Sequence, residues 1–200
     1  MIKLCLFDVG GTINTSMDIG LLARKLDYSD VDALQEFCRM HVFGAYDLEP
    51  DPYVLLRAVK DFTGSDKSCD EIWEIFRDCR GGFNLSFLKA LDFCRSYHIK
   101  TGLLTNVSGI YTEDNLFLCE YLKIPYIFQS CDLHLVKPKM DIYEYVELST
   151  GYYSQDIIFI DDCEDNLRAP RELGWYTAKV SADKGESLCQ PIVDIVKQFI

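Results

Sequence analysis

The sequence predicts an α/β fold in which a three-layer core, built on a parallel sheet, carries an all-helical cap inserted after the first strand. From residue 85 onward, short runs of continuously apolar residues alternate with amphipathic helical stretches. This alternation is typical of parallel strands covered by helices on both faces. Residues 14–83 instead have helical periodicity and no convincing strand. We therefore expect a Rossmann-like core formed by residues 1–13 and 84–200, and a helical cap formed by residues 14–83.

The elements of the core follow in order along the chain. The first strand covers residues 3–7 and ends at Asp8. Later strands are expected in apolar runs rich in β-branched or aromatic residues, at residues 100–106, 126–130, 156–162 and 175–180. Helices are expected where apolar residues recur at helical spacing, at residues 85–97, 115–122, 141–150 and 166–174. Gly174 ends the last of these helices.

The cap contains two helices with clear end signals. The stretch 51–64 begins with Asp51, which can cap a helix, and with Pro52, which suits the first helical position. It ends at Gly64. The next helix begins with Ser68 and Glu71 at the spacing of a capping box. These signals predict two consecutive helices within the insert.

Composition limits the class of protein. The 200 residues are 48% hydrophobic with a mean hydropathy of -0.01, so the chain can bury a substantial core in one domain, with at most a modest insert. The net charge of -12 and the pI near 4.6 argue against nucleic-acid binding, which needs a basic face. An acidic protein that binds an anionic substrate needs a metal ion or a locally basic pocket.

Cysteine and histidine usage favours a reducing compartment. The nine cysteines are scattered and form no CxxC pair, and the three histidines lack metal-ligand spacing. The N-terminus has no evident signal peptide, and no apolar run approaches the roughly eighteen residues of a membrane span. We expect a cytoplasmic protein that binds neither nucleic acid nor membrane.

Four short motifs lie at strand ends of the predicted sheet. The carboxyl ends of parallel strands meet at one edge, and ligands bind there in open α/β sheets. This edge would collect an acid, a hydroxyl, an amide, a lysine and a pair of acids, namely Asp8, Thr105, Asn106, Lys137, Asp161 and Asp162. Each motif alone also fits a turn, a strand end or a helix cap. Their occurrence at successive strand ends favours one shared site.

The set has the chemistry of metal-assisted phosphoryl transfer. Asp8 is the expected carboxylate nucleophile toward phosphorus. Asp8 and Asp162, with a backbone carbonyl near Gly10, offer the hard oxygen ligands that Mg²⁺ prefers, and Asp161 is expected to assist directly or through water. The ion offsets the repulsion between an anionic nucleophile and an anionic phosphate.

Polar donors and one cation complete the predicted site. Thr105 and Asn106 can donate hydrogen bonds to the non-bridging oxygens of a phosphate. Lys137 supplies positive charge that stabilises both the phosphate and the nucleophile. Lys137 and the metal are therefore the locally basic feature that an acidic protein needs for an anionic substrate.

The segments "FDVGGT", "LLTN", "KP…IYE" and "FIDDCEDNL", in this order, resemble the first to fourth motifs of the haloacid dehalogenase (HAD) superfamily. The place of the insert resembles members with a small helical cap, including phosphatases related to the N-terminal domain of soluble epoxide hydrolases. The resemblance implies a Mg²⁺-dependent phosphohydrolase that acts on a small phosphorylated metabolite through an aspartyl-phosphate intermediate.

One position departs from the family pattern. Most phosphatases of the superfamily have a second aspartate two residues after the nucleophile, which protonates the leaving oxygen and later activates water. Gly10 occupies this position here. General acid–base assistance contributes about 10²–10⁴ in rate, so its loss is serious. Either Gly10 restricts the enzyme to good leaving groups, or water or a cap residue takes the place of the acid, with Asp18 as one candidate.

Two other functions stay open at this point. The glycine at position 10 is consistent with a catalytically weak or non-catalytic protein that binds a phosphorylated ligand. The intact Asp8 and Lys137 count against this alternative. A haloacid dehalogenase also uses an aspartate nucleophile but needs no metal. The acidic pair Asp161 and Asp162 beside Lys137 favours a metal site and therefore a phosphatase. The sequence identifies neither the substrate nor the oligomeric state.

Overall fold

The computed structural model describes residues 1–199 and confirms the α/β class. All strand pairs are parallel, and the strand order is β3-β2-β1-β4-β5. The strands are β1 (Leu4–Phe7), β2 (Lys100–Thr105), β3 (Tyr126–Gln129), β4 (Ile157–Asp161) and β5 (Tyr176–Lys179). Phe7 at the end of β1 is paired with Leu103 on one side and with Ile160 on the other. This register brings Asp8, Thr105 and Asp161 to the same edge of the sheet.

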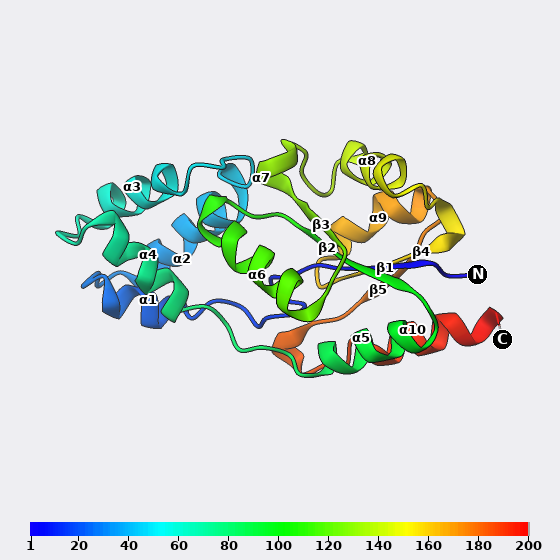
Figure 1. The fold of residues 1–200 in the computed structure, drawn as a ribbon. Helices are drawn as coiled ribbons and strands as arrows, with labels where there is room; N and C mark the ends of the chain where they lie inside the picture. Colours follow the sequence, from blue (N-terminus) through cyan, green and yellow to red (C-terminus); the bar gives the residue numbers. More distant parts are fainter. Residues whose placement is uncertain (200) are drawn as a thin grey trace.

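Helices cover both faces of the sheet and make three layers (Figure 1). On one face pack α5 (Ser86–Ser96), α6 (Thr112–Leu122) and α10 (Cys189–Val196). On the other pack α8 (Met140–Thr150) and α9 (Glu164–Glu172), while the short α7 (Ser130–Leu133) follows β3 directly. The remaining short segments are 3₁₀ turns: η2 (Gly109–Tyr111), η3 (Ser154–Asp156), η4 (Ala182–Lys184) and η5 (Lys197–Phe199).

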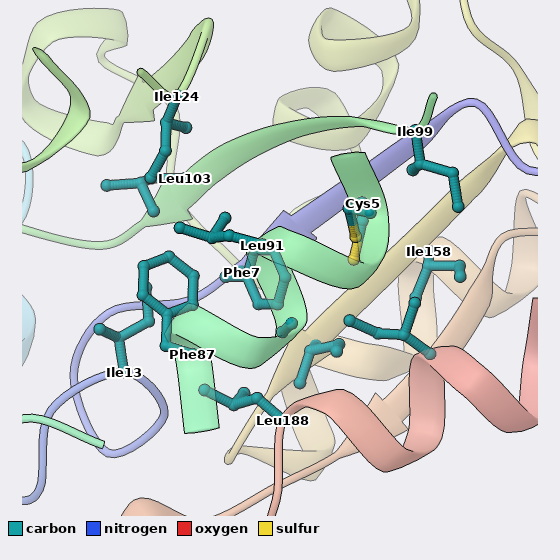
Figure 2. Close-up of a cluster of buried hydrophobic side chains, with 14 of the residues drawn as sticks. Cys5, Phe7, Ile13, Phe87, Leu91, Ile99, Leu103, Ile124, Ile158 and Leu188 are labelled. Carbon is teal, nitrogen blue, oxygen red and sulfur yellow. The ribbon is translucent and has the colours of Figure 1, made fainter. Parts of the chain in front are cut away.

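The core under α5 holds β1 rigidly in place. Phe7 meets Phe87 edge-on, with ring centroids 5.0 Å apart. Figure 2 shows this pair among apolar side chains of the cluster on this face of the sheet, including Leu91, Leu103 and Leu188. All five of these side chains are buried. Because Phe7 precedes Asp8 directly, this packing fixes the position of the strand end that carries the acid.

The insert after β1 is helical, as predicted, and lies beyond the carboxyl ends of the strands (Figure 1). It consists of α1 (Ile19–Lys25), α2 (Val31–Phe37), the π-helical segment η1 (Cys38–Ala45), α3 (Pro52–Thr63) and α4 (Cys69–Asp78). Asp51 caps α3 by accepting a hydrogen bond from the Tyr53 N–H, and Gly64 ends it with a φ of 66°. Ser68 and Glu71 form the expected capping box.

The two linkers between insert and core run side by side. The Thr15 N–H donates to Gly82 O at 2.9 Å, and the Gly82 N–H donates to Thr15 Oγ1 at 2.7 Å. A Cβ atom at Gly81 would lie 1.9 Å from Thr15 O, so only glycine permits this approach. The boundaries expected from the sequence fall in these linkers, and we propose residues 14–83 as the cap on that basis.

Several element boundaries differ from the sequence-based predictions. Ser130 was expected to end a strand, but it begins α7. The helix expected from residue 115 begins already at Thr112, and the one expected from residue 166 begins at Glu164. The elements α1, α2, η1, α7 and α10 were not predicted individually. The helix α7 is only four residues long, whereas α10 has an apolar stripe that includes Ile192 and Val196 and that the prediction did not include.

Candidate active site

Lys137 lies between two buried carboxylates at the edge of the sheet. Its Nζ donates hydrogen bonds to Asp8 Oδ1 and to Asp161 Oδ2, each at 2.7 Å. Asp8 is 6% exposed, Lys137 3% and Asp161 0%. The three residues come from the end of β1, the loop before α8 and the end of β4. Side chains that the sequence only placed at one edge are therefore in direct contact.

The contact sets the protonation of this group. Burial raises the pKa of Asp8 to about 7, and the charge of Asp161 adds to this effect, while the charge of Lys137 opposes it. For Lys137, burial alone would lower the pKa, but the charges of Asp161 and Asp8 outweigh burial and raise it above its usual range. Lys137 is therefore a permanent cation, and Asp8 carries a carboxylate that is easily neutralised.

The carboxylate of Asp161 is fully occupied by donors. Its Oδ1 accepts from the Cys163 N–H at 2.8 Å, and Asn166 Nδ2 lies 3.1 Å from each of its two oxygens. Together with Lys137, these contacts hold the carboxylate in place. Asn166, in the first turn of α9, thus fixes the carboxylate that holds Lys137. The arrangement suits a residue that orients Lys137 more than it suits a direct metal ligand.

Asp162 is the neighbouring acid, and it packs against Gly11. A Cβ atom at Gly11 would lie 2.5 Å from Asp162 Oδ2, and Gly11 has a φ of +73°, which a side chain rarely adopts. Burial and the charge of Asp161 raise the pKa of Asp162. One carboxylate oxygen each from Asp8, Asp161 and Asp162 lies within 4.8 Å of the others. Two of these acids share the Lys137 ammonium group, and the surplus of oxygen donors in the cluster fits a hard divalent cation.

The two polar residues after β2 have different environments. Thr105 is buried, and its hydroxyl makes only a long contact of 3.4 Å to Asn106 O. The amide of Asn106 exchanges two hydrogen bonds of 2.9 Å with the backbone of Lys137. One N–H of this amide therefore positions Lys137, which leaves its second N–H for a ligand.

Gly10 is exposed and has space beside it. A Cβ atom built there would meet none of the described residues within 4 Å, and the φ of Gly10 lies outside the left-handed region. Neither backbone conformation nor packing therefore requires glycine. The candidate replacement acid, Asp18, caps α1 by accepting from the Leu21 N–H at 2.8 Å, and it is not among the described residues that line the cavity above Asp8.

The cavity between core and cap has a volume of about 740 Å³. Asp8, Thr105 and Lys137 line it from the core. Arg39 and Asp47 line it from the insert. Sequence reasoning missed Asp47, since a single acid in a break between two helices follows no periodic or motif signal.

No protein-family model matches the chain. A predicted HAD-like family hydrolase from Porphyromonas gingivalis matches it with a TM-score of 0.78 at 18% identity, over 98% of both chains. A HAD family enzyme from Bacteroides thetaiotaomicron, in complex with magnesium and inorganic phosphate, gives 0.77 at 20% identity, over 95% of this chain and 98% of that one.

A more distant match is the L-2-haloacid dehalogenase from Xanthobacter autotrophicus, with a TM-score of 0.65 at 15% identity, over 90% of this chain and 78% of that one. At these identities the likeness concerns the fold. Since the first two matches extend over nearly the whole length of both chains, the shared fold includes the helical insert. Within residues 1–199, no helix has both the length and the apolarity that a membrane span requires.

Proposed function

We propose that this chain, which has the fold of the HAD-like hydrolases, is a Mg²⁺-dependent phosphohydrolase acting on a small phosphorylated metabolite through an aspartyl-phosphate at Asp8. The observation that carries the proposal is the contact of Lys137 with Asp8 and Asp161, beside Asp162 and at the floor of the cavity. Magnesium and phosphate bound to the Bacteroides thetaiotaomicron enzyme support the same ligand classes here.

Three groups would hold the metal. Asp8 and Asp162 supply carboxylate oxygens and Gly10 a backbone carbonyl, while Asp161 contributes by orienting Lys137 or through water. Bound Mg²⁺ supplies positive charge that offsets the repulsion between nucleophile and phosphate. The surplus of carboxylates over cations supports this assignment, because three acids beside one lysine leave negative charge uncompensated.

The chain's own residues perform the remaining tasks. The carboxylate of Asp8 attacks phosphorus, and the Lys137 ammonium favours the ionised form of that carboxylate and holds it in position. Lys137 also offsets the charge of the transferred phosphoryl group. The Thr105 hydroxyl and the second N–H of Asn106 donate to its oxygens. The cap encloses the cavity, which excludes water and selects substrates by size and shape.

Hydrolysis of a panel of phosphorylated metabolites, with and without Mg²⁺, tests the proposal. Asp8→Asn removes the nucleophile, and Asp61→Asn is the matched control, since Asp61 is an exposed acid on α3. Turnover that needs Mg²⁺, disappears in Asp8→Asn and persists in Asp61→Asn is expected.

The rival functions give different results in the same experiment. Binding of Mg²⁺ and inorganic phosphate without any turnover would identify a non-catalytic phospholigand-binding protein. Metal-independent halide release from 2-haloacids would identify a dehalogenase.

A further inference from the structure

Asp47 is a buried acid in the cavity wall that has no role in the proposed function so far. It lies between η1 and α3 and is 4% exposed. Among the described residues, no hydrogen bond or ion pair reaches its carboxylate, although its backbone is bonded. A buried carboxylate without a partner reduces stability, so its place in a ligand cavity is a reason to look for a function.

The backbone around Asp47 is attached to the core. Ser130, the first residue of α7, donates from its hydroxyl to Asp47 O and accepts from the Val107 N–H at 2.8 Å. The Gly109 N–H donates to Glu49 O at 2.9 Å. A Cβ atom at Gly109 would lie 2.0 Å from Pro50 O. The segment that follows Asp47 is therefore in close contact with η2. Asp47 is thus held at a fixed place relative to the strand ends that carry the site.

The environment of Asp47 suits proton transfer near neutral pH. Burial raises its pKa to about 7, and the charge of Lys137 limits this rise. The other titratable side chains in the cavity wall are Asp8, Arg39, Arg80, Tyr111, Lys137, Asp162, Cys163 and Asp165. Arg80 is already engaged with Asp114 and Asn115. Among the acids in the described part of the insert, Asp47 therefore combines a position in the cavity wall with a pKa suited to proton transfer near neutral pH.

We propose that Asp47 is the general acid and base of the reaction and supplies from the insert what Gly10 lacks. The inference rests on the proposed phosphohydrolase function. Phosphoryl transfer is in line, so the leaving oxygen points away from the Asp8 nucleophile. Asp8 lines the cavity from the core, and Asp47 lines it from the insert. In this proposal the Asp47 carboxyl group meets the leaving oxygen, which departs away from Asp8.

The proposed reaction has two steps, transfer of the phosphoryl group to Asp8 and hydrolysis of the aspartyl-phosphate. An oxygen of Asp8 forms a bond to phosphorus, the bond from phosphorus to the leaving oxygen breaks, and the proton of the Asp47 carboxyl passes to that oxygen. The products are an aspartyl-phosphate, an alcohol and the Asp47 carboxylate. Water then attacks the phosphorus while Asp47 takes one of its protons. This step releases inorganic phosphate and restores the Asp8 carboxylate and the protonated Asp47.

A leaving-group series separates proton transfer from a structural role. The substrates are p-nitrophenyl, phenyl and ethyl phosphate with Mg²⁺, and kcat/KM reports the steps up to release of the alcohol. In Asp47→Asn, kcat/KM for ethyl phosphate is expected to fall by about 10²-fold or more, and for p-nitrophenyl phosphate by only a few fold, since that leaving group needs little protonation. Asp61→Asn, which removes an exposed acid from α3, should leave the whole series unchanged.

Other outcomes overturn the inference in distinguishable ways. Equal losses for all three substrates in Asp47→Asn, or no loss, would exclude Asp47 as the acid while leaving the phosphohydrolase in place. If the wild-type protein hydrolyses neither these esters nor any phosphorylated metabolite of the panel with Mg²⁺, the proposed function fails, and the role of Asp47 fails with it. A circular-dichroism spectrum equal to that of the wild type, with a melting temperature that is not lower, would show that Asp47→Asn is folded.

Discussion

Lys137 Nζ donates to Asp8 Oδ1 at 2.7 Å although both side chains are almost completely buried. An ion pair of this kind is costly to desolvate, and breaking it by removing one partner leaves an uncompensated charge in a medium of low polarity. The pair also determines reactivity, because burial raises the pKa of Asp8 to about 7 even with Lys137 present. Without the charge of Lys137 this pKa would be higher still, so the lysine increases the ionised fraction of the nucleophile at neutral pH.

The first prediction concerns this pair. Lys137→Met should lower kcat by about 10²–10³-fold or more, since it removes electrostatic stabilisation and favours protonated Asp8. It should also lower the free energy of unfolding at pH 7 by about 3–5 kcal/mol, because Asp8 and Asp161 lose their counter-charge. Steady-state kinetics and urea denaturation measure the two effects. Unfolding that is unchanged at pH 7 would contradict the ionised state assigned to this group.

The second prediction compares the effects of alanine substitutions at two adjacent glycines, Gly10 and Gly11, on Mg²⁺ binding. Gly11→Ala places a Cβ where Asp162 Oδ2 lies, 2.5 Å away, and it has to adopt a φ of +73°. It should weaken Mg²⁺ binding by about 10–100-fold, as displaced ligands do. Gly10→Ala is the matched control, because nothing lies within 4 Å of its Cβ. Calorimetric titration with Mg²⁺ measures the affinity of both variants for the ion. Equal Mg²⁺ affinities of Gly11→Ala and Gly10→Ala would refute Asp162 as a ligand.

The third prediction uses the open space at Gly10. Gly10→Asp restores a carboxyl group two residues after Asp8 and should increase kcat/KM for poor leaving groups such as ethyl phosphate. The gain should be larger in the Asp47→Asn background, up to about 10²-fold, because the wild-type protein already has an acid in Asp47. Turnover unchanged for every phosphate ester in both backgrounds would mean that a second acid is irrelevant at this position.

The fourth prediction concerns stability and pH. The folded state raises the pKa of Asp47 from 3.8 to about 7, because burial disfavours its carboxylate. Between pH 4 and 7 the folded chain thus retains a proton that the unfolded chain has released, so this group's contribution to stability falls as pH rises. Asp47→Asn should be more stable than the wild type at pH 8, by up to about 4 kcal/mol, and the difference should shrink toward pH 4.

Urea denaturation of the two proteins at pH 4, 6 and 8 measures this difference, and Asp61→Asn serves as the control for loss of an exposed acid. A stability difference that does not change with pH would show that Asp47 is ionised in the folded state as readily as in the unfolded chain.

Much of the fold follows from local patterns in the sequence. The helical periods of α3 and α4 and the apolar runs of β2 and β4 depend on neighbouring residues alone, as do the capping groups at Asp51 and Ser68. The elements η1 and α7 were missed because tertiary contacts, and not a repeating pattern, stabilise them. The strand-end residues were identified for a related reason, since a parallel sheet places all carboxyl ends at one edge whatever the details of packing.

The sequence alone thus determined the α/β class, the helical insert and the residue types at the edge of the sheet, because periodicity and end signals act over a few residues. Only the tertiary structure decided which groups touch. Lys137 contacts Asp8 across 129 residues of chain, Asp161 is occupied by Asn166 and a backbone N–H, and Asp47 faces the cavity because Ser130 holds its backbone. Such contacts depend on how distant segments pack, and burial in that packing sets the pKa of each acid.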